Sequence, residues 1–211
     1  MKQTWDISPP VDEHSPVFAG DTVYAQRLHF GLGPNCPVNV HAITLSPHTG
    51  AHADAPLHYS AGAAAVGALA LEPYLGPCRV IHCLDAGPLV ELAHIAHALR
   101  PIAGRALPQR VLFRTAKVAS QAWGAFTALA AQMLDELAAR QVLLVGIDTP
   151  SVDPATSQTL DAHQALLRHD MRVLENLVLD DVAEGDYELI ALPLKLSRSD
   201  ASPVRAILRE L

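Results

Sequence analysis

The sequence predicts an α/β protein with one main sheet flanked by helices. Strand-like segments outnumber helical ones, and the two kinds alternate irregularly along the 211 residues. Residues 142–147 form a continuous apolar run, as is typical of a strand covered on both faces. Residues 127–140 instead place apolar side chains at helical spacing. The length and the hydrophobic content of 50% indicate a single domain, residues 1–211, with a sizeable core.

The first quarter of the chain is expected to be mostly extended. Residues 6–8 predict a first strand, which is ended by the two prolines that follow it. Residues 15–21 are rich in turn-forming residues and predict a loop. Residues 22–30 and 36–45 contain β-formers and predict two more strands. His41 lies inside the second of these and is interpreted as a core histidine whose ring is hydrogen-bonded.

The rest of the chain alternates short strands with helices. Small residues between positions 60 and 71 predict a short helix or a loop. Apolar residues at helical spacing predict helices at residues 89–98, 127–140 and 159–169. Apolar runs and β-formers predict strands at residues 79–84, 110–114, 142–147, 173–176, 188–192 and 204–208.

Charge and hydropathy argue against two classes of partner. Lys and Arg total 15 and Asp and Glu total 22, so the net charge is −7 and the basic residues are scattered. This balance argues against nucleic acid or an anionic membrane as a partner. The N-terminus lacks an apolar signal core, and no apolar run reaches the length of a bilayer span. Cys36, Cys78 and Cys83 match no zinc-finger spacing and are expected to be buried thiols in a cytoplasmic protein.

The most informative segment is residues 47–58, with the sequence PHTGAHADAPLH. Its histidines and its aspartate all occupy even positions. Alternate side chains of an extended chain face the same side, so a strand would direct the whole polar set one way. Two prolines and a glycine disfavour a helix here. The polar set comprises His48, His52, Asp54 and His58.

Metal binding requires this segment to bend. In a straight strand His48 and His52 would lie roughly 13 Å apart, whereas zinc–nitrogen bonds measure only about 2.0–2.1 Å. We therefore expect a bend at Gly50 that gathers His48, His52 and Asp54 around one metal. His58 would lie nearby as a proton carrier. Such ligands suit zinc, manganese or iron. The alternative is a histidine-rich surface loop, because the chain has 11 histidines.

Two later residues are candidate ligands of a second metal, with Asp54 as a bridge. His163 and Glu175 both follow the loop of residues 148–154, which comes directly after a buried strand. Otherwise, His163 is a solvent-facing helix residue and Glu175 a charge at a strand edge. A dimetal site suits hydrolysis of a carbonyl compound, with His58 passing a proton from water to the departing amine. A metal-binding module without catalysis is the alternative from another functional class.

The pattern His-x-Gly-x-His-x-Asp-x-Pro-x-His at residues 48–58 resembles the signature of the cyclase-type metal hydrolases. Similarity to one branch, the bacterial kynurenine formamidases (arylformamidases), extends over nearly the whole chain. Ala19 stands where this branch is expected to have proline, which concerns the shape of a loop and not the ligand set. The segments that carry the similarity to this branch are residues 15–21, 146–154, 174–177, 187–194 and 200–206.

The resemblance implies a swivelling β/β/α fold, a homodimer and two zinc ions per subunit, with manganese or another divalent metal as a substitute. It implies hydrolysis of N-formyl-L-kynurenine to L-kynurenine and formate, in tryptophan degradation by the kynurenine pathway. A related hydrolase that opens a cyclic amide such as isatin is the alternative within the same family.

The resemblance also implies roles for individual residues. His58 would be the proton donor and acceptor. Phe18, in the loop of residues 15–21, would line the substrate pocket, where its ring could stack on that of the substrate. The two implied zinc sites are formed by His48, His52 and Asp54 and by Asp54, His163 and Glu175.

Overall fold

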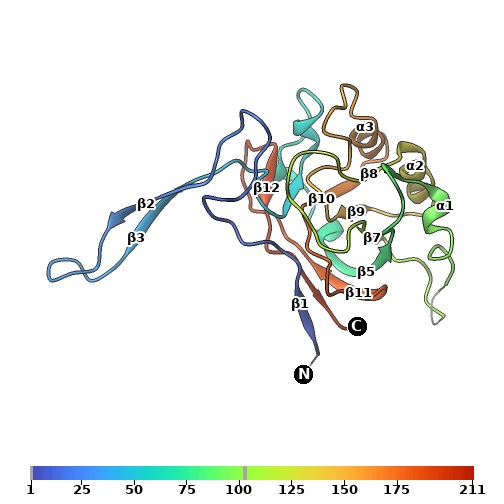
Figure 1. The fold of residues 1–211 in the computed structure, drawn as a ribbon, viewed down its shortest axis with the longest axis horizontal. Helices are drawn as coiled ribbons and strands as arrows, with labels where there is room; N and C mark the ends of the chain where they lie inside the picture. The colour runs from blue at the N-terminus through green and yellow to red at the C-terminus, as the bar shows by residue number, and fades with distance from the viewer. Residues whose placement is uncertain (1, 102–103) are drawn as a thin grey trace.

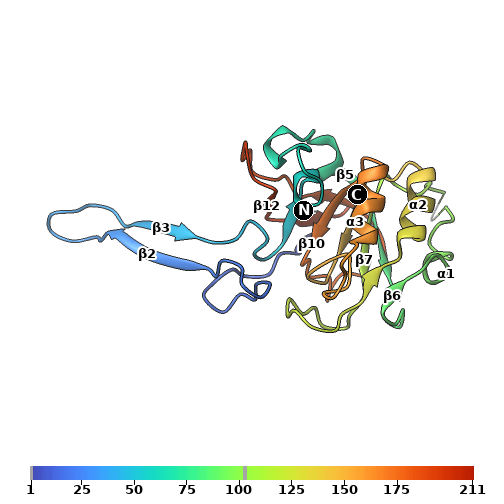
Figure 2. The ribbon, with the colours of Figure 1, turned by 90° about the horizontal axis from the view of Figure 1, so that it is seen from above.

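The computed structural model describes residues 2–101 and 104–211, and a nine-stranded sheet lies at its centre (Figures 1 and 2). The strand order in this sheet is β1-β13-β11-β5-β7-β9-β10-β4-β12. Its strands are β1 (Thr4–Asp6), β4 (His52–Asp54), β5 (Leu75–His82), β7 (Arg110–Arg114), β9 (Leu144–Ile147), β10 (Arg172–Glu175), β11 (Gly185–Ile190), β12 (Ala201–Pro203) and β13 (Ile207–Arg209). Two small sheets pair β2 (Ala25–Phe30) with β3 (Val40–Thr44) and β6 (Leu89–Val90) with β8 (Ala128–Leu129).

The predicted mixed α/β class with one main sheet is confirmed. In the part of the chain that is described, the α-helices are α1 (Leu92–Ile95), α2 (Ala131–Ala139) and α3 (Asp161–Arg168), and the 3-10 helices are η1 (Pro56–His58), η2 (Val66–Ala68) and η3 (Glu72–Tyr74). None of the helices with described positions is long and apolar enough to cross a membrane.

The centre of the sheet is buried on both faces. Strands β5, β7, β9 and β10 run parallel to one another. Val111 and Phe113 belong to the apolar cluster that includes α2 and α3, whereas Leu112 belongs to the cluster on the opposite face. Helices α1, α2 and α3 lie together at one end of the molecule (Figure 2). A strand covered on both faces needs no polar side, which explains the unbroken apolar run at residues 142–147.

Several predicted elements are present with shorter bounds. Strand β7 has the predicted bounds, and residues 60–71 contain only the short helix η2. The helices predicted at residues 89–98 and 127–140 each lose their first residues to a strand. The reason is that β6 and β8 pair in parallel there, so α1 and α2 begin after that pairing ends.

Two predictions at the sheet edges are wrong in position. The first strand lies at Thr4–Asp6 and not at residues 6–8, because it is Thr4–Asp6 that pairs with β13. The strand predicted at residues 204–208 overlaps only β13, which begins at Ile207. Residues 204–206 instead connect β13 to β12, and these two strands lie near opposite ends of the strand order. Four Cα–Cα steps separate their ends, which reach at most about 15 Å. The sheet must therefore curl until its two sides come close together.

Strands β2 and β3 form a hairpin that projects from the body of the protein (Figures 1 and 2). Every residue in both strands is exposed. The interpretation of His41 as a core histidine is therefore wrong, since it lies exposed on β3. Cys36, beyond the end of β2, is partly exposed, whereas Cys78 and Cys83 are buried as expected.

The bend expected at Gly50 is present. Gly50 has φ of +67°, in the left-handed region that favours glycine. The ring centroids of His48 and His52 are 5.1 Å apart as a result, far less than in a straight strand. A Cβ at position 50 would lie 2.6 Å from Cγ2 of Val11, so the bend also brings two parts of the chain into close contact.

We expect Gly50→Ala to lower the free energy of unfolding by about 1–3 kcal/mol, from backbone strain together with the clash against Val11. Urea unfolding of the metal-free protein measures this loss. Gly62→Ala is the matched control, because Gly62 has φ of +75° and no described heavy atom within 4 Å of an added Cβ. Equal losses in the two variants, or no recovery when Val11→Ala is added to Gly50→Ala, would contradict the role of the contact.

Candidate active site

Strand β4 lies at the centre of the candidate site, between β10 and β12. Its antiparallel register places Glu175 of β10 opposite His52, and Ala201 of β12 opposite Asp54. Directly opposite residues on antiparallel strands share a face, so Glu175 and His52 project to the same side. Ala53 projects to the other side, into the apolar core. The alternation seen in the sequence is thus what directs the polar residues of β4 into the site.

The first group of candidate ligands comes from β4 and the bend before it. Nδ1 of His48 lies 3.1 Å from Oδ1 of Asp54, and Nε2 of His52 lies 3.4 Å from the same oxygen. One ligand atom from each of these residues lies within 4.8 Å of the others. The structure therefore brings together the three residues expected at the first metal.

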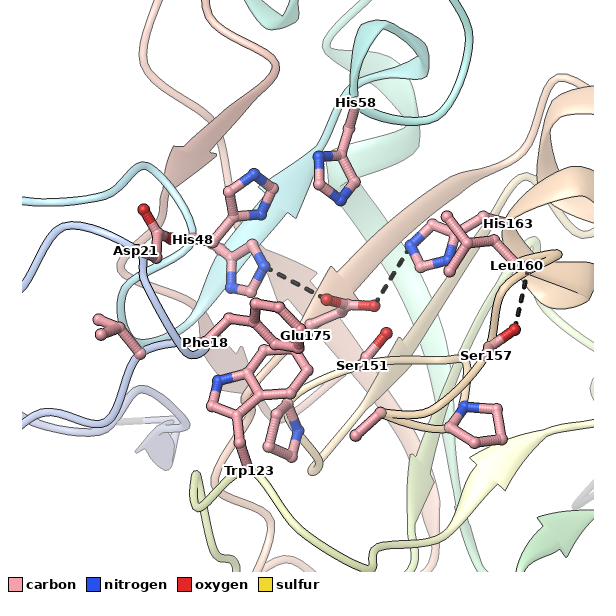
Figure 3. A pocket seen from close by; sticks show the side chains of 15 residues that line it. Phe18, Asp21, His48, His58, Trp123, Ser151, Ser157, Leu160, His163 and Glu175 are labelled. Carbon is pink, nitrogen blue, oxygen red and sulfur yellow. Dashed lines mark hydrogen bonds and ion pairs between the residues drawn. The ribbon is translucent and has the colours of Figure 1, made fainter.

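The second group joins β4 to distant parts of the chain, and Figure 3 shows two of its members, His163 and Glu175, facing each other. Nε2 of His163, on α3, lies 3.3 Å from Oδ2 of Asp54 and 3.6 Å from Oε1 of Glu175. Oε2 of Glu175 lies 3.3 Å from Nε2 of His52. Asp54 thus directs one oxygen to each group, as a bridging carboxylate would. All five expected ligands meet at one place, and His163 is buried instead of facing solvent.

Asp153 orients His163 and was not identified from the sequence. Its Oδ2 lies 2.7 Å from Nδ1 of His163, and its two oxygens accept the backbone N–H groups of Ala162 and His163 at the start of α3. A carboxylate is favourable at a helix N-terminus because it satisfies free N–H groups there. The sequence signal was available, since Asp153 lies in the loop of residues 148–154.

The donor atoms fit a bound cation. Among the buried side-chain atoms of the described residues that lack a hydrogen-bond partner are Nε2 of His52 and Oδ1 of Asp54. Both atoms belong to the first group of candidate ligands. Leaving a buried polar atom unpaired costs about 1–3 kcal/mol, and more for a charged group. A metal ion held by these atoms would remove that cost.

The electrostatics of the site also favour positive charge. Burial lowers the pKa of His48, but Asp54 and Asp200 outweigh burial and raise this pKa to about 9. Burial opposes a similar rise at His163, whose pKa reaches about 10 beside Asp153 and Asp54. Burial raises the pKa of Asp54, but the hydrogen bond with His163 and the nearby ring of His48 hold this pKa well below its usual value.

His58 ends the short helix η1, directly after β4, and lines the same pocket. Its ring centroid lies 4.3 Å from that of His48 and 6.0 Å from that of His163. The side chain is partly exposed, unlike the buried side chains of His52 and His163. His58 is therefore close enough to serve both candidate metal positions while remaining in contact with solvent.

The pocket beside these residues has a volume of about 340 Å³. Phe18 and Trp123 form one wall, with ring centroids 4.9 Å apart in an edge-on arrangement (Figure 3). Phe18 is 49% exposed, so it lies over the pocket and not in the core. Trp123 carried no sequence signal, because it lies in a loop without periodicity. The other apolar lining residues are Val17, Pro150, Pro154, Ala155 and Leu160.

Comparisons with known proteins agree with this arrangement. Residues 5–154 match the family described as putative cyclase. The kynurenine formamidase of Polaromonas naphthalenivorans is 72% identical over 207 residues, which cover 98% of this chain and 91% of that protein. The kynurenine formamidase of Bordetella pertussis is 65% identical, with complete coverage of both chains.

Solved structures share the fold over the whole chain. A structure described as a potential metal-dependent hydrolase with cyclase activity has a TM-score of 0.85 at 28% identity and covers 100% of this chain and 99% of its own. Isatin hydrolase A from Labrenzia aggregata, bound to benzyl benzoate, also has a TM-score of 0.85, at 21% identity, with coverage of 99% and 94%. The second likeness concerns the fold alone.

High identity over the full length, together with the family match over residues 5–154, decides the classification. The chain belongs to the kynurenine formamidases, hydrolases of the cyclase family.

Proposed function

We propose that the chain hydrolyses N-formyl-L-kynurenine to L-kynurenine and formate, in tryptophan degradation by the kynurenine pathway. The observation that carries this proposal is the position of the Asp54 carboxylate. One of its oxygens faces the first ligand group and the other faces the second, and both groups lie beside an aromatic-walled pocket. A formyl amide has a small, unhindered carbonyl, and its aryl group is flat. Such a substrate fits a site with candidate metal ligands at one end and aromatic rings at the other.

In this proposal the site holds two zinc ions, and manganese or another divalent metal could replace zinc. When bound, such ions activate water at neutral pH and stabilise the negative charge that develops on the carbonyl oxygen. Asp153 supports one ligand by fixing the ring of His163. The ligands are His48, His52 and Asp54 for one ion and Asp54, His163 and Glu175 for the other.

His58 carries the proton in this mechanism. A neutral His58 accepts a proton from the attacking water and then gives it to the departing aniline nitrogen. Phe18 and Trp123 hold the aromatic ring of the substrate, and their edge-on pairing keeps both rings in place. Asp21 also lines the pocket and is exposed, so its carboxylate is suited to bind the ammonium group of the substrate.

Two other functions compete with this one. A hydrolase that opens a cyclic amide such as isatin would share the ligands and differ in the pocket. The shared fold of isatin hydrolase A supports this alternative only at the level of architecture. A metal-binding protein without catalysis would use the ligands but would have no need of His58.

We expect His58→Ala to lower kcat for N-formyl-L-kynurenine by roughly 10²-fold or more, because it removes general acid–base catalysis. Metal content should stay at the wild-type level, since His58 belongs to neither ligand set. Steady-state kinetics and elemental analysis of the same preparations measure both quantities. His97→Ala is the control, because His97 is exposed and pairs with Glu184 outside the site.

Parallel assays with isatin distinguish the competing functions. The wild-type protein should have a kcat/KM for N-formyl-L-kynurenine at least ten times that for isatin. The reverse preference would favour the cyclic-amide hydrolase. Full activity of His58→Ala, or no turnover of either compound by the metal-loaded wild type, would reject the proposed mechanism.

Metal binding should release protons at neutral pH. The raised pKa values of about 9 and about 10 keep His48 and His163 protonated at pH 7 in the metal-free protein. A metal needs the lone pair of each ring, so on the order of two protons must leave. Calorimetric titration with zinc, in buffers of different ionisation enthalpy, measures the release, which should fall as the pH rises through 9 and 10.

The matched variants for this titration lie on α3 and directly after its end. His163→Gln should reduce the proton release, whereas His169→Gln should not, because His169 follows the end of α3 and contacts Asp135. Heats of zinc binding that do not depend on the buffer at pH 7 would contradict the predicted proton release.

We further propose that the protein is a cytoplasmic homodimer, with the whole chain as one domain in each subunit. An isolated two-stranded hairpin is at best marginally stable in water, yet β2 and β3 are exposed throughout. Between residues 22 and 45 the only Lys, Arg, Asp or Glu is Arg27, in a chain of net charge −7. A second copy of the chain would cover the exposed apolar residues of this hairpin, which include Leu28, Phe30, Leu32, Val38 and Ile43.

Light scattering during gel filtration should give twice the chain mass of 22.5 kDa for the wild type. Phe30→Asp with Ile43→Asp should weaken association at least tenfold, because a charge in an apolar contact must be desolvated. Leu92→Asp is the control, since α1 lies at the opposite end of the molecule from the hairpin (Figures 1 and 2). A monomeric wild type, or hairpin variants that associate normally, would contradict the proposed dimer.

A further inference from the structure

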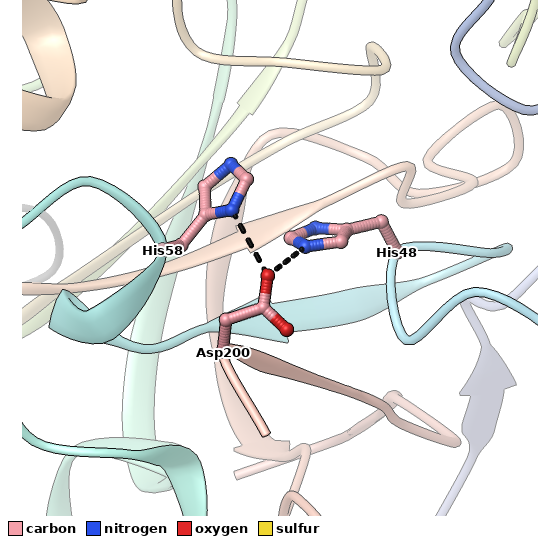
Figure 4. Close-up of side chains that lie close together, drawn as sticks. All are labelled: His48, His58 and Asp200. Atoms are coloured by element: carbon pink, nitrogen blue, oxygen red, sulfur yellow. Dashed lines mark hydrogen bonds and ion pairs between the residues drawn. The ribbon is translucent and has the colours of Figure 1, made fainter. Parts of the chain in front are cut away.

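Asp200 links two histidines of the site, and the mechanism above gives it no role. Its Oδ2 lies 3.1 Å from Nε2 of His48 and 3.3 Å from Nδ1 of His58 (Figure 4). The same carboxylate oxygen therefore contacts both a candidate metal ligand and the candidate proton carrier. The three residues form a cluster of their own, with one nitrogen or oxygen from each within 4.8 Å of the others.

The backbone fixes the position of Asp200 relative to His58. Asp200 directly precedes β12, whose first residue, Ala201, pairs with Asp54 of β4. The backbone N–H of Ala55 donates to the carbonyl oxygen of Asp200 over 2.8 Å, and the N–H of His58 donates to the carbonyl oxygen of Ala55 over 2.9 Å. Main-chain bonds thus hold the two residues together, so truncation of the Asp200 side chain leaves this framework intact.

The contacts with Asp200 decide which nitrogen keeps its hydrogen in neutral His58, and in His48 once a cation has displaced the proton on Nδ1. An ionised carboxylate only accepts hydrogen bonds, so the ring nitrogens that contact Asp200 must carry hydrogen. In a neutral ring the other nitrogen then keeps its lone pair. In His48 that nitrogen is Nδ1, which lies 3.1 Å from Asp54 in the first ligand group. In the metal-free protein Nδ1 also carries hydrogen, because it contacts the Asp54 carboxylate, and its lone pair would become free only when a cation displaces that proton. In His58 the nitrogen that keeps its lone pair is Nε2, which points away from Asp200 (Figure 4).

Both free lone pairs are the ones that the chemistry requires. A metal ligand must be an unprotonated nitrogen, and a general base must present a lone pair to the proton that it removes. With the opposite tautomers, His48 would turn an N–H group toward the ligand group and His58 would turn one toward the pocket. In the zinc-loaded protein, a single carboxylate oxygen would disfavour both arrangements.

We propose that Asp200 is a positioning residue that sets the tautomer and ring orientation of His48 and His58 together. It couples the metal site to the proton carrier without itself touching the substrate. This inference rests on the proposed function, because it assigns His58 the role of base. Carboxylates that orient metal-bound histidines typically contribute 10–100-fold to metal affinity or activity.

The test compares Asp200→Ala and Asp200→Asn with the wild type, all loaded with zinc. We expect Asp200→Ala to lower kcat 10–100-fold while KM changes less than threefold. Asp200→Asn preserves size and one acceptor oxygen, so its loss should be smaller. Asp135→Ala is the matched control, because Asp135 is 43% exposed, like Asp200 at 41%, and its Oδ1 contacts Nε2 of His169 at 2.8 Å. This control should keep full activity.

Coupling through His58 is measured by a double-mutant cycle. In the His58→Ala background, Asp200→Ala should cost less than in the wild type, because the part that acts through His58 has already been lost. Chelator competition for zinc in both backgrounds measures the part that acts through His48. Equal and additive losses in kcat would overturn the proposed coupling.

Nitrogen-15 NMR of the zinc-loaded protein reads the tautomer directly and does not depend on any substrate. With histidine labelled and the His58 signals assigned from His58→Gln, the wild type should show hydrogen on Nδ1 of His58, and Asp200→Ala should show a mixture. An unchanged tautomer in Asp200→Ala would overturn the inference even if activity fell. If the wild type fails to hydrolyse N-formyl-L-kynurenine but the tautomer still depends on Asp200, the proposed function fails while the positioning role stands.

Discussion

The pairing of β4 with two neighbouring strands is the interaction on which the rest of the site depends. β4 is only three residues long, but it is hydrogen-bonded to β10 on one side and to β12 on the other. This register sets Glu175 beside His52 and the start of β12 beside Asp54. A slip of one residue would turn every ligand of β4 into the core. The fully buried Ala53, which packs on the opposite face, opposes such a slip.

The site concentrates acidic side chains that need nearby positive charge to be stable. Asp54, Asp153 and Glu175 are all buried, and buried carboxylates are costly unless they are paired. His163 pairs with Asp54 and Asp153, which accounts for its raised pKa. The order of the site therefore depends on positive charge, supplied by protonated histidines in the metal-free protein. Bound cations would take over this role, with the carboxylates remaining ionised.

The sequence was informative where a pattern is local. His48, His52, Asp54 and His58 fall within eleven residues. Strand alternation predicts the common face of His52 and Asp54, and the bend at Gly50 brings His48 to them, whereas His58 reaches the site from η1. Asp153 and Trp123 come from loops, where no periodicity marks which residue turns inward. His41 shows a different limit, because alternation predicts a strand without saying whether that strand joins the main sheet. The strand predicted at residues 204–208 was misplaced because pairing, and not local propensity, decides where β12 ends and β13 begins.

The order of the strands along the chain has a consequence for biosynthesis. β4 is translated in the first quarter of the chain, but its two neighbours, β10 and β12, are translated in the last fifth. At ribosomal rates of about 5–20 residues per second, β4 waits on the order of ten seconds for both neighbours to emerge. His52 and Asp54 remain without their final neighbours during that time. A nascent chain can therefore complete this centre only when its synthesis is nearly finished, so a cation site that includes Glu175 could form only at the last stage of folding.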